Sequence, residues 1–303
     1  MEFEFATKKT EEREDDPVVF SGMYSDTEEI AMLRIPEGTV EICENAFRGF
    51  EHIKEVYIPS SVKKISAAAF AGCKNLAKVK IEEGVIEILD EAFSSCPSLR
   101  DVTLPATLRR IGEGCFEACA SLSHITIPDG VEMLGASCFN YCFNLTDVYI
   151  PDSCILCEFM AFANCFGLES VRLSDNMRLI DESLFEGCRS LKEVDLPTKL
   201  VKIGARAFKG CSSLSQIILP VGMKSLGFDA FADCSSLKRI ALPKELSEIE
   251  DYDAFAGCDS LTDISYGGSS EEFSSLMRGR ALTLQRSDTT PYAPKIHFMD
   301  LKI

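Results

Sequence analysis

The sequence lacks long hydrophobic runs and has fewer basic residues than acidic ones. No stretch approaches the roughly 18 uninterrupted apolar residues of a membrane-spanning helix, so bilayer insertion is not expected. The 48 acidic residues outnumber the 31 basic ones and give a formal net charge of −17. Because an acidic surface repels phosphate backbones and anionic lipid headgroups, nucleic acids and membrane surfaces are disfavoured as partners.

Histidine is also scarce, and the first residues do not have the pattern of a secretory signal. His52, His124 and His297 are the only histidines, which limits acid–base catalysis. Residues 1–16 carry seven acidic and three basic residues and no apolar run, so no signal peptide is expected. This absence favours a cytoplasmic location.

What the sequence does contain is a repeated octet. AFAGCKNL at residues 69–76 returns as AFKGCSSL from residue 207 and as AFAGCDSL from residue 254. Its phenylalanine recurs every 23 residues, with one final spacing of 24, at Phe47, Phe70, Phe93, Phe116, Phe139, Phe162, Phe185, Phe208, Phe231 and Phe255. A unit of this length cannot bury its own apolar face, so successive units are expected to stack and share one core.

A cysteine column accompanies the phenylalanines, three residues after each from the second copy onward. Its members are Cys73, Cys96, Cys119, Cys142, Cys165, Cys188, Cys211, Cys234 and Cys258. The column keeps the core period, so buried, inert thiols are expected. Neighbouring parallel strands lie about 4.8 Å apart whereas disulfides need Cβ atoms about 3.8 Å apart, which argues against a disulfide ladder. The spacing of the 14 cysteines does not indicate disulfide pairs, which favours a reducing compartment or deep burial of the thiols.

Each repeat also carries alternating apolar residues that predict a strand. Pairs such as Val79/Ile81 and Val148/Ile150 alternate with polar residues, and a proline usually follows. This pattern is typical of a short strand that the proline ends. A second apolar step, such as Val62/Ile65, sends the chain back, and the Ala-Phe segment is expected to form a short helical or 3₁₀ turn.

The full motif, LxxIxIPxxVxxIGxxAFxGCxx, resembles the BspA-like or Treponema-type leucine-rich repeat over roughly residues 30–266. The resemblance implies an α/β fold, namely a leucine-rich-repeat solenoid with a parallel β-sheet on its concave face and short helical or 3₁₀ turns and a second short strand step elsewhere in each coil. Family members are mostly surface or secreted proteins of bacteria and protists that bind host proteins or other cells. The resemblance therefore implies adhesion or recognition and a secreted or cell-surface location, with no catalytic residues and no cofactor.

The ends of a solenoid would expose its core and need caps. We therefore divide the chain into an N-terminal cap at residues 1–30, about ten coils at residues 31–266 and a C-terminal cap at residues 267–303. Capping strands are expected near Phe3 and Phe5 and at residues 18–20. In the C-terminal cap, Ser269 or Ser270 is expected to begin a short helix, followed by strands at residues 281–285 and 295–299.

Two features invite a chemical interpretation. His124 is expected between Asp101 and Asp147 of the neighbouring coils, with Ser123 beside it, which is compatible with a hydrolase. However, the sequence indicates no activated nucleophile, oxyanion hole or closed pocket. A solvated charge ladder is the plainer interpretation. The pairs Cys115/Cys119, Cys138/Cys142 and Cys154/Cys157 imitate metal or redox spacings. Their extra cysteines occupy core positions of the repeat, so no metal site is expected.

The outward residues of the strands offer a flat lattice for a partner. Tyrosine and arginine are enriched at interface hot spots because they combine contact area with a polar end. The candidate partner-binding residues are Tyr57, His124, Tyr149, Arg172, Asp195, Ile218 and Arg239. A lattice of mixed charge favours a protein or peptide ligand, so we predict a non-enzymatic, monomeric protein-binding module. An intracellular scaffold and a glycan-binding surface through Tyr57 and Tyr149 are the alternatives.

Overall fold

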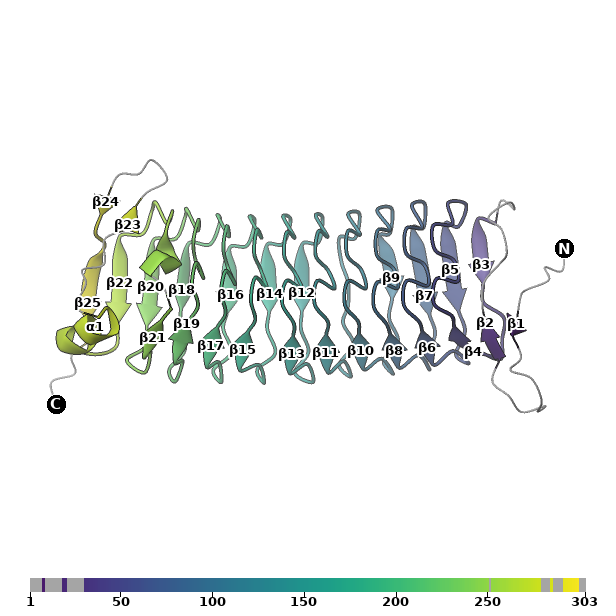
Figure 1. The fold of residues 1–303 in the computed structure, drawn as a ribbon, viewed down its shortest axis with the longest axis horizontal. Coiled ribbons are helices and arrows are strands. Elements are labelled where there is room, and N and C mark those ends of the chain that lie inside the picture. Colours follow the sequence, from purple (N-terminus) through teal and green to yellow (C-terminus); the bar gives the residue numbers. More distant parts are fainter. Residues whose placement is uncertain are drawn as a thin grey trace.

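In the computed structural model the chain is a solenoid of stacked coils (Figure 1). The structure describes residues 7–8, 18–20, 30–250, 252–278, 284–285 and 291–299. Most coils add a strand to a sheet of long strands and a shorter strand, usually of two residues, to a second sheet. Strands of successive coils pair in parallel with partners 23 residues apart, as in Val56 with Val79. The sequence period is therefore the register of the sheets, and the predicted leucine-rich-repeat solenoid is confirmed.

The long strands cover one face of the solenoid, here called the long-strand face. They form three parallel sheets rather than one. The first contains β3 (Met32–Arg34), β5 (Glu55–Ile58), β7 (Lys78–Ile81) and β9 (Asp101–Thr103). The second contains β12 (Asp147–Tyr149), β14 (Ser170–Arg172) and β16 (Glu193–Asp195). The third contains β18 (Gln216–Ile218), β20 (Arg239–Leu242), β22 (Asp263–Tyr266) and β25 (Lys295–Phe298).

The short strands form a second ladder along the solenoid. One group contains β4 (Thr39–Ile42), β6 (Lys64–Ile65), β8 (Glu87–Ile88), β10 (Arg110–Ile111), β11 (Met133–Leu134) and β13 (Leu156–Cys157). Another contains β15 (Leu179–Ile180), β17 (Lys202–Ile203), β19 (Ser225–Leu226) and β21 (Glu248–Ile249). At the N-terminal end β2 (Val18–Phe20) pairs in parallel with β4 and antiparallel with β1 (Thr7–Lys8). Phe3 and Phe5 lie outside the described residues.

One predicted strand does not form. The alternation of Ile125 and Ile127 predicts a strand with His124 on its outer side, but residues 125–127 have no strand conformation. A single bridge joins His124 to Asp147 of the next coil, and β9 of the preceding coil does not pair with this segment. The two isoleucines are nevertheless buried. The alternation therefore predicts their burial correctly, but it does not predict that the hydrogen bonds of a strand are missing here.

The Ala-Phe segments are turns rather than helices. In the described part of the chain the one 3₁₀ helix is η1 (Tyr252–Phe255), in the last copy. Left-handed residues bracket the phenylalanines of the earlier copies, as Ala68 (φ 52°) and Gly72 (φ 74°) bracket Phe70. The N–H of Phe70 donates to the carbonyl oxygen of Ala92 in the next coil at 2.8 Å. Left-handed residues interrupt a right-handed helix, and the backbone bonds run between coils instead.

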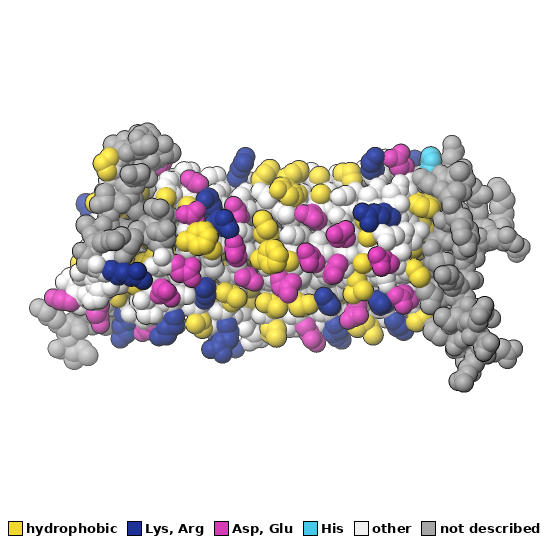
Figure 2. All heavy atoms as spheres, viewed as in Figure 1, with side chains coloured by type: hydrophobic (Ala, Val, Ile, Leu, Met, Phe, Trp, Pro, Cys, Tyr) yellow, Lys and Arg dark blue, Asp and Glu magenta, His cyan; other side chains and the backbone are white. Residues whose placement is uncertain are grey.

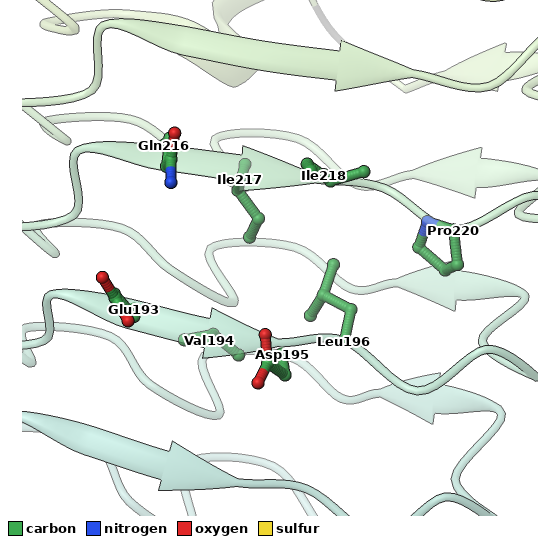
Figure 3. A pocket seen from close by; sticks show the side chains of 8 residues that line it. All are labelled: Glu193, Val194, Asp195, Leu196, Gln216, Ile217, Ile218 and Pro220. Atoms are coloured by element: carbon green, nitrogen blue, oxygen red, sulfur yellow. The ribbon is translucent and has the colours of Figure 1, made fainter.

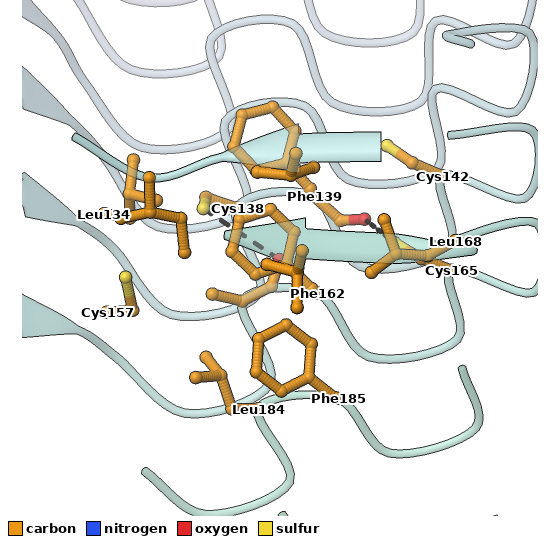
Figure 4. Packing of buried hydrophobic residues seen from close by; sticks show 14 of the residues in the cluster. Leu134, Cys138, Phe139, Cys142, Cys157, Phe162, Cys165, Leu168, Leu184 and Phe185 are labelled. Atoms are coloured by element: carbon orange, nitrogen blue, oxygen red, sulfur yellow. Dashed lines mark hydrogen bonds between the residues drawn. The ribbon is translucent and has the colours of Figure 1, made fainter. Parts of the chain in front are cut away.

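The phenylalanines form a continuous stack through the core (Figure 4). Successive ring centroids from Phe47 to Phe255 lie 5.1–6.0 Å apart, with interplanar angles of at most 19°. These values fit offset stacking, which adds to the hydrophobic gain of burying each ring. The stack therefore links every coil to the next.

The cysteine column satisfies the carbonyl groups beside this stack. Cys165 Sγ donates to the carbonyl oxygen of Phe139 at 3.2 Å (Figure 4). Cys142 Sγ donates to the carbonyl oxygen of Phe116 in the same way. Thirteen of the 14 cysteines are buried free thiols. Burial raises the pKa of the Cys165 and Cys188 thiols well above the ordinary value. The prediction that the thiols of the cysteine column are buried is confirmed.

The described part of the C-terminal segment packs on the last repeat. β25 pairs in parallel with β22, while β23 (Leu284–Gln285) pairs antiparallel with β24 (Pro291–Tyr292). The helix α1 (Ser270–Leu276) begins at Ser269, whose side chain and that of Glu272 form a capping box. Phe273 of this helix is buried against Tyr266, with ring centroids 5.3 Å apart. The apolar end of the last coil is thereby covered.

Candidate functional site

The register of the long strands brings part of the predicted lattice together. Tyr149, Arg172 and Asp195 are direct partners on β12, β14 and β16. Ile218 ends β18, and Arg239 begins β20 opposite Gln216. Tyr57 lies 92 residues, or four coils of 23, before Tyr149 and does not join this group.

Arg172 is held by neighbours that the sequence did not reveal. Its guanidinium lies 5.0 Å from the ring centroid of Tyr149 and donates to the carboxylate of Asp152 at 2.7 Å. A second, longer contact of 3.4 Å joins Arg172 to Asp175. The hydrogen bond from Arg172 lowers the pKa of Asp152 below its ordinary value. Tyr149 and Arg172 thus form an ordered cation–π platform, and the guanidinium bonds these turn carboxylates although Asp195 is its register partner.

His124 has one carboxylate partner instead of the expected two. Its Nδ1 lies 3.0 Å from Oδ1 of Asp147 and 3.4 Å from the hydroxyl of Thr146. Asp101 bonds Lys78 Nζ at 2.8 Å instead. The ring contacts within hydrogen-bond range are therefore to Asp147 and Thr146, and Ser123 does not contribute its hydroxyl as a nucleophile would require. This arrangement fits an exposed hydrogen-bonded pair better than a catalytic group.

Tyr57 is covered by cations from both neighbouring strands. The guanidinium of Arg34 lies 5.3 Å from its ring centroid and the Lys80 ammonium lies 5.5 Å from it. Arg34, Tyr57 and Lys80 are register partners on β3, β5 and β7. A sugar that stacked on this ring would have to displace a cation, which disfavours the glycan interpretation at Tyr57.

The long-strand face opens between β16 and β18 (Figure 3). These neighbouring strands belong to different sheets, and the space between them has a volume of about 330 Å³. We call this space the interstrand opening; its lining residues are Glu193, Val194, Asp195, Leu196, Gln216, Ile217, Ile218 and Pro220. Leu196 and Ile217 point into the space, and Val194 and Leu196 are only half-buried. The equivalent Val171 and Leu173, one coil earlier, are buried.

Two carboxylates stand at the rim of the interstrand opening without a cation. Glu193 and Asp195 form no ion pair with any residue that the structure describes. The nearby Lys192 pairs with Glu169 at 2.6 Å, and Arg239 donates to Gln216 at 3.0 Å. Ile218, beside them on β18, has 71% of its surface exposed. The opening thus combines apolar walls with two unbalanced negative charges.

The rest of the surface gives little support for other ligands. Figure 2 shows acidic, basic and apolar side chains interspersed on one face, without a continuous basic area. Among the described residues no cluster of histidine, cysteine and carboxylate groups is suited to a metal ion. Cys154 and Cys157 are buried with their sulfur atoms 3.8 Å apart, and the hydrogen bond between them lowers the pKa of Cys154. No helix in residues 30–250 or the other described segments is long and apolar enough to cross a membrane.

The repeat pattern matches a known family model. The description of that model is BspA type leucine rich repeat region (6 copies), and it covers residues 40–166 and 158–277. The chain belongs to the BspA-type leucine-rich repeat family. This fold is a protein-interaction fold. No curated protein matches the sequence.

Solved structures similar to this BspA-type chain come from several bacteria. A leucine-rich repeat protein of T. pallidum is 28% identical, with a TM-score of 0.50, over 69% of this chain and 87% of that one. A leucine-rich repeat protein of Bacteroides ovatus is 24% identical, with a TM-score of 0.45, over 99% of both chains. A leucine rich cell surface protein of Faecalibacterium prausnitzii is 21% identical, with a TM-score of 0.41, over 87% of this chain and 94% of that one.

Proposed function

We propose that this BspA-type repeat protein is a non-enzymatic module that binds another protein through its long-strand face, in adhesion or recognition at a cell surface. The observation that carries the proposal is the Tyr149–Arg172 platform on β12 and β14, next to β16, which forms one side of the interstrand opening. An ordered aromatic–arginine pair loses little side-chain freedom on binding, and a neighbouring apolar hollow can accept an anchor residue. The two features together give a partner both a polar contact and an apolar one.

The long-strand face has the chemistry of a protein contact rather than that of a polyanion site. Oppositely charged side chains pair between neighbouring strands on this face, as Lys78 of β7 does with Asp101 of β9. Arg172 and Asp152 add a bidentate pair beside Tyr149. Such mixed surfaces select partners by complementary charge and fix their orientation.

Affinity capture with a triple variant tests this proposal. Tyr149→Ala, Arg172→Ala and Asp195→Ala together should weaken partner binding at least about 30-fold, because a hot-spot residue is typically worth about 2 kcal/mol or more. The matched control is Ile155→Ala, Arg178→Ala and Glu132→Ala, which removes exposed apolar, basic and acidic residues next to the short strands β13, β15 and β11.

The capture should use both host extracellular matrix and cell lysate, read by mass spectrometry, after both variants have been shown to fold. A partner lost in the first variant and kept in the control supports the long-strand face. Its origin separates adhesion from an intracellular scaffold. Equal capture by all three proteins would place the contact elsewhere and contradict the proposal.

A further inference from the structure

Charge compensation fails on this part of the long-strand face. In the row that contains Glu193, Asp101, Asp147 and Asp263 each contact a lysine or histidine at 2.8–3.0 Å. The register partner of Glu193 on β14 is Ser170, and Gln216 holds the same position on β18. Asp195 lies between Arg172, which is held by Asp152, and Ile218. These three acids have a side-chain partner, whereas both rim carboxylates of the interstrand opening are available to an external cation.

Apolar side chains also line the interstrand opening, and a ligand must match them. Leu196 and Ile217 point into it, Val194 lies along its wall, and Ile218 stands exposed beside it, with 71% of its surface accessible. Its volume of about 330 Å³ lies at the lower end of the roughly 300–1,000 Å³ range of enclosed ligand pockets. That size suits one or two apolar side chains of a partner better than a whole small-molecule ligand.

We infer that the interstrand opening binds an extended, basic segment of the partner protein in which an aliphatic residue is flanked by lysine or arginine two positions away on either side. This inference rests on the proposed protein-binding function. Alternate residues of an extended chain share one face, so the aliphatic side chain enters the opening while both basic side chains face the protein. Long basic side chains can then reach Glu193 and Asp195 while their methylene groups cover Ile218.

The alternative ligands fit this chemistry less well. An acidic peptide or a phosphate would add negative charge beside two carboxylates that already lack a cation. A purely apolar segment would bury the rim carboxylates without pairing them, which is costly. A basic segment with an aliphatic centre satisfies both the charge and the apolar surface.

Fluorescence anisotropy with short peptides tests the inference. The probe peptide has the sequence Gly-Lys-Ser-Leu-Ser-Lys-Gly, and two companions replace both lysines by glutamate or the leucine by serine. Binding of the probe should fall at least tenfold in the Glu193→Gln, Asp195→Asn protein and should weaken with added salt. The matched control protein, Glu132→Gln, Glu248→Gln, removes the same net charge beside the short strands β11 and β21 and should bind as the wild type does.

The outcomes separate this inference from the proposed function. Absence of probe binding, equal binding of the glutamate peptide, or equal loss in the control protein would overturn the inference. The proposed function would still stand if the captured partner were lost in a Tyr149→Ala, Arg172→Ala variant and retained by the Glu193→Gln, Asp195→Asn variant. If neither variant changed the capture, both proposals would fail.

Discussion

Replacing Phe162 by alanine should lower the free energy of unfolding by about 3–5 kcal/mol, the usual range for a fully buried phenylalanine. The ring is completely buried, and its centroid lies 5.4 Å from that of Phe139 and 5.8 Å from that of Phe185. Its removal would leave a cavity between two coils that the flanking rings cannot fill without shifting the backbone. Urea denaturation followed by circular dichroism measures the loss.

Phe159 provides the control in the same coil. It is also a phenylalanine, three residues earlier, but 48% of its surface is exposed. Phe159→Ala should therefore cost less than about 1 kcal/mol, since surface substitutions rarely exceed that range. Equal losses in the two variants would show that the stacked rings do not join the coils as described.

The stability of the fold should fall steeply above about pH 8.5, where free thiols begin to ionise. Ten buried thiols have a pKa that is raised in the fold, those of Cys96, Cys115, Cys119, Cys138, Cys142, Cys157, Cys165, Cys188, Cys211 and Cys234. Above the unfolded pKa the unfolded chain loses these protons and the folded chain keeps them. Each of these thiols then favours unfolding by up to about 1.4 kcal/mol per pH unit.

The measurement is the urea midpoint between pH 7 and pH 9.5 under a reducing agent. The sign follows from the raised pKa values: the stabilisation is complete below the unfolded thiol pKa and is lost as the pH rises above it. The variant Cys142→Ala, Cys165→Ala, Cys188→Ala starts from a lower stability but should lose stability more slowly with pH, because three titrating thiols are gone. A midpoint that stays constant up to pH 9.5 would contradict thiol burial.

Repetition explains which parts of the fold could be predicted from the sequence. The 23-residue register, the phenylalanine stack and the cysteine column each recur in nearly every coil, so chance substitutions such as Phe50 in the cysteine column do not hide them. The helix α1 could also be anticipated, because Ser269 and Glu272 have the spacing of a capping box.

The site was less predictable because it depends on single coils. Val194 and Leu196 keep the same alternation as Val171 and Leu173, so no sequence signal marks the loss of pairing between β16 and β18. The sequence therefore does not mark Glu193 and Leu196 as lining residues of the interstrand opening, whereas Asp195 and Ile218 are among the predicted partner-binding residues. The partner of Arg172 was also missed, because Asp152 lies in a turn of the preceding coil, which strand register does not place.

Binding through the long-strand face is tested most directly by photo-crosslinking from two matched positions. Ile218 on β18 and Ile155 beside β13 have similar exposure, at 71% and 66%. A photoreactive amino acid at each position, with the captured partner present, should give a covalent complex from position 218 and none from position 155. Equal crosslinking at both positions, or crosslinking at position 155 alone, would contradict binding through the long-strand face.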